Sequence, residues 1–449
     1  MDVMTATVPA NRATHRAIEA VWRIESARLI AGLARTVRDV GLAEELAQDA
    51  LVIALEQWPA AGVPENPGAW LMATAKHRAI DLLRRRTRYE RKLEEIGRDL
   101  EVHGQGSEPD LDAALDDHVG DDLLRLMFIA CHPVLPTEGR VALTLRMLGG
   151  LTTAEIARAF LIPEPTVAQR IVRAKRTLAK HQVPFEPPPR AELADRLSSV
   201  LEVVYLVFNE GYSATAGDDW MRPSLCQEAL RLGRILAGLM PDEAEVHGLV
   251  ALMEIQASRL RARTGPEGEP ILLLDQDRRL WDRLLSRRGL EALGRAEALG
   301  GTLGPYTVQA AIAACHARAL EPADTDWERI EALYQVLAYI SPSPVVELNR
   351  AVAVGMASGP ARGLAVADAV VSEGTLDGYP QLPAVRGDLL AKLGRLDEAR
   401  AEFERAAALT RNERERGVFL ARAAACAEPP AGHAGPGPRP GGSGRRART

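Results

Sequence analysis

Apolar residues recur at three- and four-residue spacing along most of this 449-residue chain. Side chains at that spacing share one face of an α-helix, so the pattern predicts helices. Within the first 92 residues it predicts three, at 15–38, 42–58 and 68–88. The proline-rich stretch 59–67 should not continue a helix, because proline lacks the amide donor and clashes with the preceding turn.

The remaining sequence divides at two places where this pattern is interrupted. An acidic, glycine-containing stretch at 93–117 predicts a flexible linker, and the proline-rich stretch 183–190 predicts a stiff hinge. The end of the chain is rich in Gly, Pro and Arg, which favours disorder. We therefore expect an all-α protein with a helical domain at 12–92, a linker at 93–117, a second domain at 118–182, a helical extension at 191–427 and a disordered tail at 428–449.

Part of the extension has the spacing of a helix-pair repeat. The residues that carry it are Gly387, Leu390, Gly394, Ala399, Phe403 and Ala406. Their offsets resemble a tetratricopeptide (TPR) helix pair, in which small residues let two antiparallel helices approach closely. A weaker copy at 349–369 has Gly359 near the place of Gly394. The extension is therefore expected to be a TPR-like domain.

The segment 151–178 has the pattern of a helix-turn-helix. Thr153 can cap a short first helix, and Pro165 suits the first turn of a second helix. On that second helix Val167 and Ile171 are predicted to face the core. Arginine and glutamine on its outer face can reach base edges, and basic side chains can neutralise phosphates. The candidate DNA contacts are Thr166, Gln169, Arg170, Arg173, Lys175 and Arg176.

A second basic helix is predicted upstream. From Trp70 to Lys92 it holds eight Lys/Arg against Asp81 and Glu90, so it can lie along a phosphate backbone. The net charge of the chain is -6, so DNA contacts must come from such local patches. For either basic helix taken alone, the alternative is an ordinary charged surface that faces solvent and does not bind DNA.

Composition narrows the class of protein. Hydrophobic residues make up 47% and aromatic residues 4%, which favours packed helices over sheets. The four cysteines stand far apart and suit a reducing cytoplasm, where we expect the protein to reside, and no stretch is apolar enough to span a bilayer. Cys131 and His132 have no second pair to hold a metal with them, so a packed thiol and a helix-end histidine are expected. We expect neither a metal nor a cofactor.

The segment 39–51, the basic run from Trp70 to Arg85, the acidic linker and the helix-turn-helix together resemble an extracytoplasmic-function (ECF) sigma factor of the sigma-70 family. The resemblance covers roughly residues 12–182. The stretches 126–135 and 140–150 look like the subgroup with a C-terminal TPR-like extension. The family implies a transcription initiation factor with no catalytic site of its own. Its partners would be core RNA polymerase, through the beta-prime clamp and the beta flap, and promoter DNA.

The resemblance also implies roles for individual residues. The polymerase-binding helix would carry Asp39, Glu44, Glu45, Gln48 and Asp49. The minus-ten DNA would face Asn66, Trp70, Lys76, His77, Arg78, Arg84 and Arg85, with Asn66 a candidate for holding a flipped-out base. The helix-turn-helix would read the minus-thirty-five element, although Leu161 stands where the turn of the family often has glycine. Ordinary turn chemistry for Asn66 and a core position for Trp70 are the alternatives.

One motif in the extension resembles a hallmark of the same subgroup. It consists of Phe208, Asn209, Glu210, Gly211 and Tyr212. Gly211 can adopt a left-handed conformation at the end of a helix, and Glu210 close to buried aromatics needs a partner. The motif is a candidate site for a regulatory protein or a brace for the DNA-binding domains, and a purely structural helix end is the alternative.

Two other functions compete with a sigma factor. A stand-alone helix-turn-helix regulator with a TPR-like sensor would bind duplex DNA by itself, usually as a dimer, but leaves the basic segment 70–86 without a function. An enzyme with the extension as its catalytic domain is disfavoured, because the sequence has no Gly-rich phosphate loop, nucleophile elbow or H-E-x-x-H motif. The sequence therefore favours a sigma factor whose activity is regulated through its extension.

Overall fold

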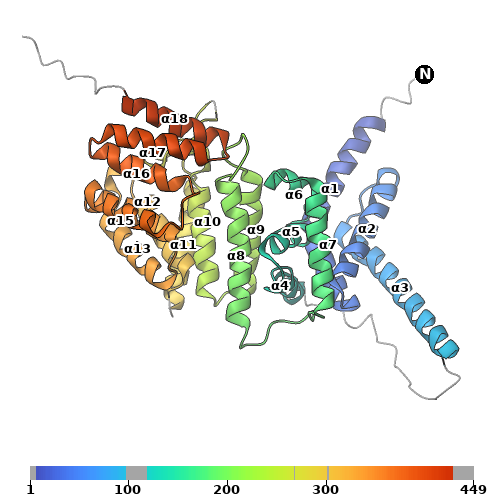
Figure 1. The fold of residues 1–449 in the computed structure, drawn as a ribbon. Helices are drawn as coiled ribbons and strands as arrows, with labels where there is room; N and C mark the ends of the chain where they lie inside the picture. Colours follow the sequence, from blue (N-terminus) through green and yellow to red (C-terminus); the bar gives the residue numbers. More distant parts are fainter. Residues whose placement is uncertain (1–6, 98–118, 267, 301–302, 428–449) are drawn as a thin grey trace, which may run out of the picture. The chain divides into compact units, whose positions relative to one another are not determined.

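A computed structural model describes residues 7–97, 119–266, 268–300 and 303–427, and its regular elements are all helices (Figure 1). The predicted all-α fold class is confirmed. Of the predicted linker, 93–97 continue a helix and 98–117 lie outside the described residues, as does the predicted disordered tail. The chain forms two compact units, one of Met1–Thr264 with Ile271–Ala323 and the other of Gly265–Pro270 with Asp324–Thr449.

The N-terminal domain consists of α1 (Thr7–Val37), α2 (Val40–Ala61) and α3 (Pro67–Gly97). Asp39 caps α2 by accepting a hydrogen bond from the Leu42 amide at 2.9 Å. The expectation that the helix stops before Pro59 was wrong, because α2 continues to Ala61. A proline this close to a helix end removes only one hydrogen bond of the last turn. Trp58 of α2 is buried and packs edge-on against Trp70 of α3, with ring centroids 5.2 Å apart.

The helix-turn-helix domain consists of α4 (Val119–Ala130), α5 (Thr137–Met147), α6 (Thr153–Phe160) and α7 (Glu164–Lys180). Thr152 caps α6, not Thr153 as expected, because Thr152 and Glu155 form a reciprocal capping box. Leu161 ends α6 in the left-handed conformation, with φ of 50°. Val167 and Ile171 are buried as predicted.

The extension begins with five α-helices in the first unit. They are α8 (Leu193–Tyr212), α9 (Pro223–Leu239), α10 (Ala244–Ala257), α11 (Arg283–Leu299) and α12 (Pro305–Arg318). Short 3-10 helices accompany them, namely η1 (Leu260–Ala262), η2 (Leu273–Asp275), η3 (Arg278–Leu280) and η4 (Pro322–Asp324). Polar contacts join α8 to the helix-turn-helix domain. Arg140 donates to Ser199 Oγ at 2.6 Å and to Glu202 at 2.9 Å, and Arg196 donates to the Phe128 carbonyl at 2.9 Å.

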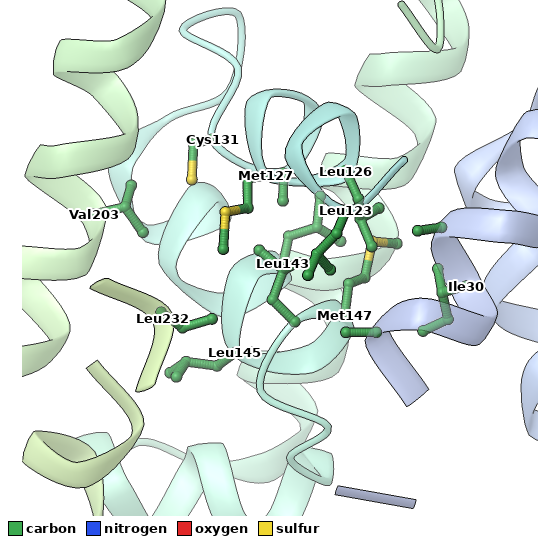
Figure 2. Close-up of a cluster of buried hydrophobic side chains, with 14 of the residues drawn as sticks. Ile30, Leu123, Leu126, Met127, Cys131, Leu143, Leu145, Met147, Val203 and Leu232 are labelled. Atoms are coloured by element: carbon green, nitrogen blue, oxygen red, sulfur yellow. The ribbon is translucent and has the colours of Figure 1, made fainter. Parts of the chain in front are cut away.

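The helix-turn-helix domain shares its hydrophobic core with the extension. Leu143 and Leu145 of α5 gather with Val203 of α8 and Leu232 of α9, and all four side chains are at most 1% exposed (Figure 2). These residues belong to one cluster of buried side chains that reaches from α1 to α10. Burying this much apolar surface is the main stabilising term in folding, so α8 and α9 complete the core of the helix-turn-helix domain.

The second unit contains the remaining helices of the extension. They are α13 (Trp327–Ile340), α14 (Pro344–Ala357), α15 (Pro360–Glu373), α16 (Gln381–Lys392), α17 (Leu396–Leu409) and α18 (Glu413–Ala427). Each packs against the next one along the chain. A Cβ atom on Gly387 would lie 2.9 Å from the Phe403 ring, so glycine lets α16 and α17 approach closely. Gly394 and Gly359 both take positive φ at the turn before the second helix of a pair, as their predicted equivalence requires.

Candidate polymerase and nucleic-acid interface

The helix α7 has one apolar and one basic face. Its inner positions Val167, Ile171, Ala174 and Leu178 are buried. Of the predicted DNA contacts, Gln169, Arg173 and Arg176 are exposed, whereas Thr166, Arg170 and Lys175 are half-buried. The capped α6 and the sharp turn at Leu161 fix where α7 begins. The result is a rigid helix whose exposed guanidinium groups can reach an anionic surface.

Lys175 is paired within the protein, in a cluster that we call the Glu44 cluster (Glu44, Arg146 and Lys175). Glu44 of α2 is only 5% exposed, and its carboxylate forms ion pairs with Lys175 of α7 and Arg146 of α5. The Arg146 Nε and Nη2 atoms lie 3.0 and 2.9 Å from Glu44 Oε1. The structure thus joins a predicted polymerase-binding residue to a predicted minus-thirty-five contact. A buried carboxylate needs such partners, because an unpaired charge is costly.

Two further ion pairs join the N-terminal and helix-turn-helix domains. Arg35 of α1 lies 3.2 Å from the buried carboxylate of Asp122 in α4. Arg23 of α1 lies 2.6 Å from Glu155 of α6. Burial opposes ionisation of Glu155, but hydrogen bonds from Thr152 and the proximity of Arg23 outweigh it and lower the pKa of the carboxyl group.

The other predicted polymerase contacts lie at the surface of α2. Asp39, Glu45 and Asp49 are exposed and Gln48 is half-buried. Asp49 forms an ion pair with Arg78 of α3 at 2.6 Å, and both side chains are about half exposed. An exposed pair of this kind contributes little to stability, so both residues can exchange partners at small cost.

The predicted minus-ten contacts lie at the start and along one side of α3. His77, Arg78, Arg84 and Arg85 are exposed, and Trp70 and Lys76 are half-buried. Asn66 is exposed and caps α3, because its Oδ1 atom accepts a hydrogen bond from the Ala69 amide at 3.1 Å. Trp70 contributes to the N-terminal core through Trp58. The two structural alternatives, turn chemistry for Asn66 and a core position for Trp70, are therefore both present.

In the extension motif, Gly211 lies inside α8 and does not take the predicted left-handed conformation. A Cβ atom there would lie 2.7 Å from the Cys226 amide, so glycine permits close contact with α9 instead. Glu210 has the predicted partner, since it forms an ion pair with Arg222 and accepts from Thr215 Oγ1 at 3.0 Å. Phe208 is fully buried and stacks on the half-buried Tyr212, whereas Asn209 is exposed.

Cys131, Cys226 and His132 have the chemistry of packed groups. Burial raises the pKa of Cys131 to about 11 and that of Cys226 to about 12, so both remain thiols. Burial, with the nearby Arg196, lowers the pKa of His132 to about 4, and its Nδ1 accepts from the Val134 amide. Among the described residues no group of His, Cys, Asp or Glu has the arrangement of a metal site. No helix in the described ranges has the length and apolar character needed to cross a membrane.

Comparison with known protein families finds three matches along the chain. Residues 24–89 match Sigma-70 region 2, and residues 125–178 match Sigma-70, region 4. Residues 196–297, within the first unit, match a family of unknown function (DUF6596). An uncharacterized protein of Rhizobium meliloti is 46% identical over 385 residues, which is 85% of this chain and 89% of that protein.

Proposed function

This chain belongs to the sigma-70 family of sigma factors and carries a C-terminal extension, and on that premise we propose that it is an ECF-type factor whose extension regulates it. The observation that carries the proposal is the order of two basic helices. The helix α3 in region 2 exposes Arg84 and Arg85, and α7 in region 4 exposes Arg173 and Arg176. Two separate basic surfaces on one chain suit contact with the phosphates of the two promoter elements.

The proposed roles follow the exposed faces. The α2 residues Glu45, Gln48 and Asp49, with Asp39 at the cap of that helix, would bind the beta-prime clamp of core polymerase, and region 4 would meet the beta flap. On α3, the basic side chains would lie along minus-ten DNA, with Asn66 at the flipped base. The protein would act in the cytoplasm, and the polymerase alone would perform the chemistry of RNA synthesis.

We further propose that the described conformation is a restrained one. Lys175 cannot neutralise a DNA phosphate while it neutralises Glu44, and Glu44 cannot contact polymerase while it is buried. The extension supports this state, because α8 and α9 pack against the same domain that supplies Arg146 and Lys175. A regulatory protein that binds the extension would act on this arrangement.

Run-off transcription with purified core polymerase tests the proposed function. The template is the DNA upstream of the gene, together with a set of candidate promoters. We expect initiation that depends on both the protein and core polymerase. Specific duplex binding without polymerase, together with no core-dependent transcript from any template, would instead indicate a stand-alone regulator.

The Glu44 cluster gives a prediction with a matched control. Glu44→Gln leaves Arg146 and Lys175 without a carboxylate, so the polar contact between α2 and α7 should loosen and free Lys175, although the shared core still joins regions 2 and 4. We expect the free protein to bind duplex DNA about fivefold more tightly, since one added phosphate contact contributes about 1 kcal/mol. Glu45→Gln removes the same charge from the exposed face of α2 and should leave this affinity unchanged.

Fluorescence anisotropy with a labelled promoter duplex, in the absence of polymerase, measures this affinity. Small-angle scattering of the same samples should show a larger radius of gyration for Glu44→Gln only. Equal affinities and equal dimensions for the two variants would contradict the restrained state.

A further inference from the structure

Arginine and aromatic side chains gather in the extension near the ends of α8 and α10. Arg263 lies over the ring of Tyr212, with 3.6 Å between its Cζ atom and the ring centroid, and 5.5 Å from the ring of Trp220. Arg259 lies 5.9 Å from the ring of Tyr212 and 5.7 Å from that of Trp281. We call these five residues the arginine–aromatic cluster.

The positive charge of this cluster is not balanced by a carboxylate. Arg259 is only 6% exposed, and in the part of the chain that the structure describes neither Arg259 nor Arg263 forms an ion pair. Burial lowers the pKa of Arg263, and repulsion from Arg259 lowers it further. Cation–π contacts offset only part of the cost of burying a charge. Arg222 is close by in sequence but is neutralised by Glu210.

The cluster also holds N–H groups that lack acceptors. Arg259 Nε, Trp220 Nε1 and Trp281 Nε1 are buried, and none has a hydrogen-bond partner among the described residues. Buried donors are nearly always paired, and an unpaired one is destabilising. All three groups are hydrogen-bond donors, and the two guanidinium groups of the cluster, those of Arg259 and Arg263, are cations. The chemistry that would satisfy all of them is an anion with several acceptor oxygens.

A third arginine and a histidine lie next to the cluster. Arg278 lies 5.1 Å from the ring of Trp281 and donates to the carbonyl oxygens of His316 and Ala319. Burial, with Arg259 and Arg278 nearby, lowers the pKa of His316 to about 4, so this histidine is neutral at physiological pH. A cationic ligand would be repelled here, whereas a carboxylate or phosphate group would be attracted.

We propose that the arginine–aromatic cluster is a binding site for a small oxyanion, the carboxylate or phosphate group of a metabolite. The guanidinium of Arg259 supplies the charge and the indole N–H of Trp281 adds a neutral donor. Tyr212, the last residue of α8, forms one wall of the site. Since α8 packs on the helix-turn-helix domain, bound anion would stabilise the helix that supports region 4. That last consequence rests on the proposed function, whereas binding itself does not.

Titration of the full-length protein with sodium phosphate or sodium succinate at constant ionic strength tests the site. Isothermal calorimetry and tryptophan fluorescence report binding, because Trp220 and Trp281 lie in the cluster. We expect saturable binding of at least one of the two anions, and the two titrations distinguish a phosphate from a carboxylate ligand. Arg259→Gln should weaken it about tenfold or more, as expected for the loss of a charged hydrogen bond.

Two variants keep the result interpretable. Arg261→Gln removes the same charge from an exposed position two residues away and should leave the dissociation constant unchanged within about twofold. Trp281→Phe keeps a ring but removes the indole N–H, and should weaken binding several-fold even if Arg259→Gln does not fold. No saturable binding of either anion, or equal weakening by Arg259→Gln and Arg261→Gln, would overturn the site. Run-off transcription is scored separately, so failure of the proposed function would leave the binding result intact.

Discussion

Replacing Arg173 and Arg176 together by alanine is expected to lower promoter-directed run-off transcription about 30-fold. Both side chains are exposed on α7 and make no ion pair within the described residues, so both are available to DNA. Loss of about 1 kcal/mol per contact gives this factor for two contacts. The salt dependence of promoter binding by the holoenzyme should also become shallower, because fewer phosphates are neutralised.

The matched control is the double variant Arg288→Ala, Arg295→Ala. These two arginines are exposed on α11 and their loss changes the net charge equally. The control should retain wild-type transcription and salt dependence. If both double variants transcribed equally well, α7 would not read the promoter, and the proposed role of region 4 would be wrong.

Leu232→Ala is expected to destabilise region 4, although Leu232 belongs to the extension. Its side chain is 1% exposed in the core shared with Leu143 and Leu145 of α5. Truncating a buried leucine costs about 3 kcal/mol through lost burial and the cavity left behind. Hydrogen exchange should therefore accelerate in α5 as well as in α9, and the urea midpoint should fall.

Leu284→Ala on α11 serves as the control, because Leu284 is 46% exposed and its truncation should change stability by less than about 0.5 kcal/mol. Faster exchange confined to α9, with α5 unaffected, would mean that region 4 folds without the extension. Because of this shared core, a variant that lacks residues from 191 onward would not test regulation alone. That deletion would expose buried side chains of region 4 in addition to removing the extension.

Features that depend on neighbours in sequence were predictable. The i, i+4 positions Val167 and Ile171 identified the inner face of α7, and the need of Glu210 for a partner was met by Arg222, twelve residues away. The cap of α6 was misplaced by one residue, although the signal was present. Thr152 and Glu155 have the spacing of a capping box, which Thr153 lacks.

Features that depend on distant residues were not predictable from one sequence. Gly211 lies at the end of an apolar helix as predicted, since α8 ends at Tyr212, but glycine is needed there for close contact with Cys226 of the next helix and not for a left-handed conformation. Arg146 was not recognised as a partner of Glu44, because 102 residues separate them and a charged residue on a helix most often faces solvent. The predicted contacts with polymerase and DNA remain predictions, since their partners lie outside this chain.

The shared core has a consequence for the synthesis of the protein. The ribosome completes the helix-turn-helix helices before it makes Val203 and Leu232, which fill their core. At roughly 5–20 residues per second, the nascent region 4 waits several seconds with apolar side chains uncovered. We therefore expect chains cut short within this interval to expose the apolar side chains of region 4 and to be prone to aggregation.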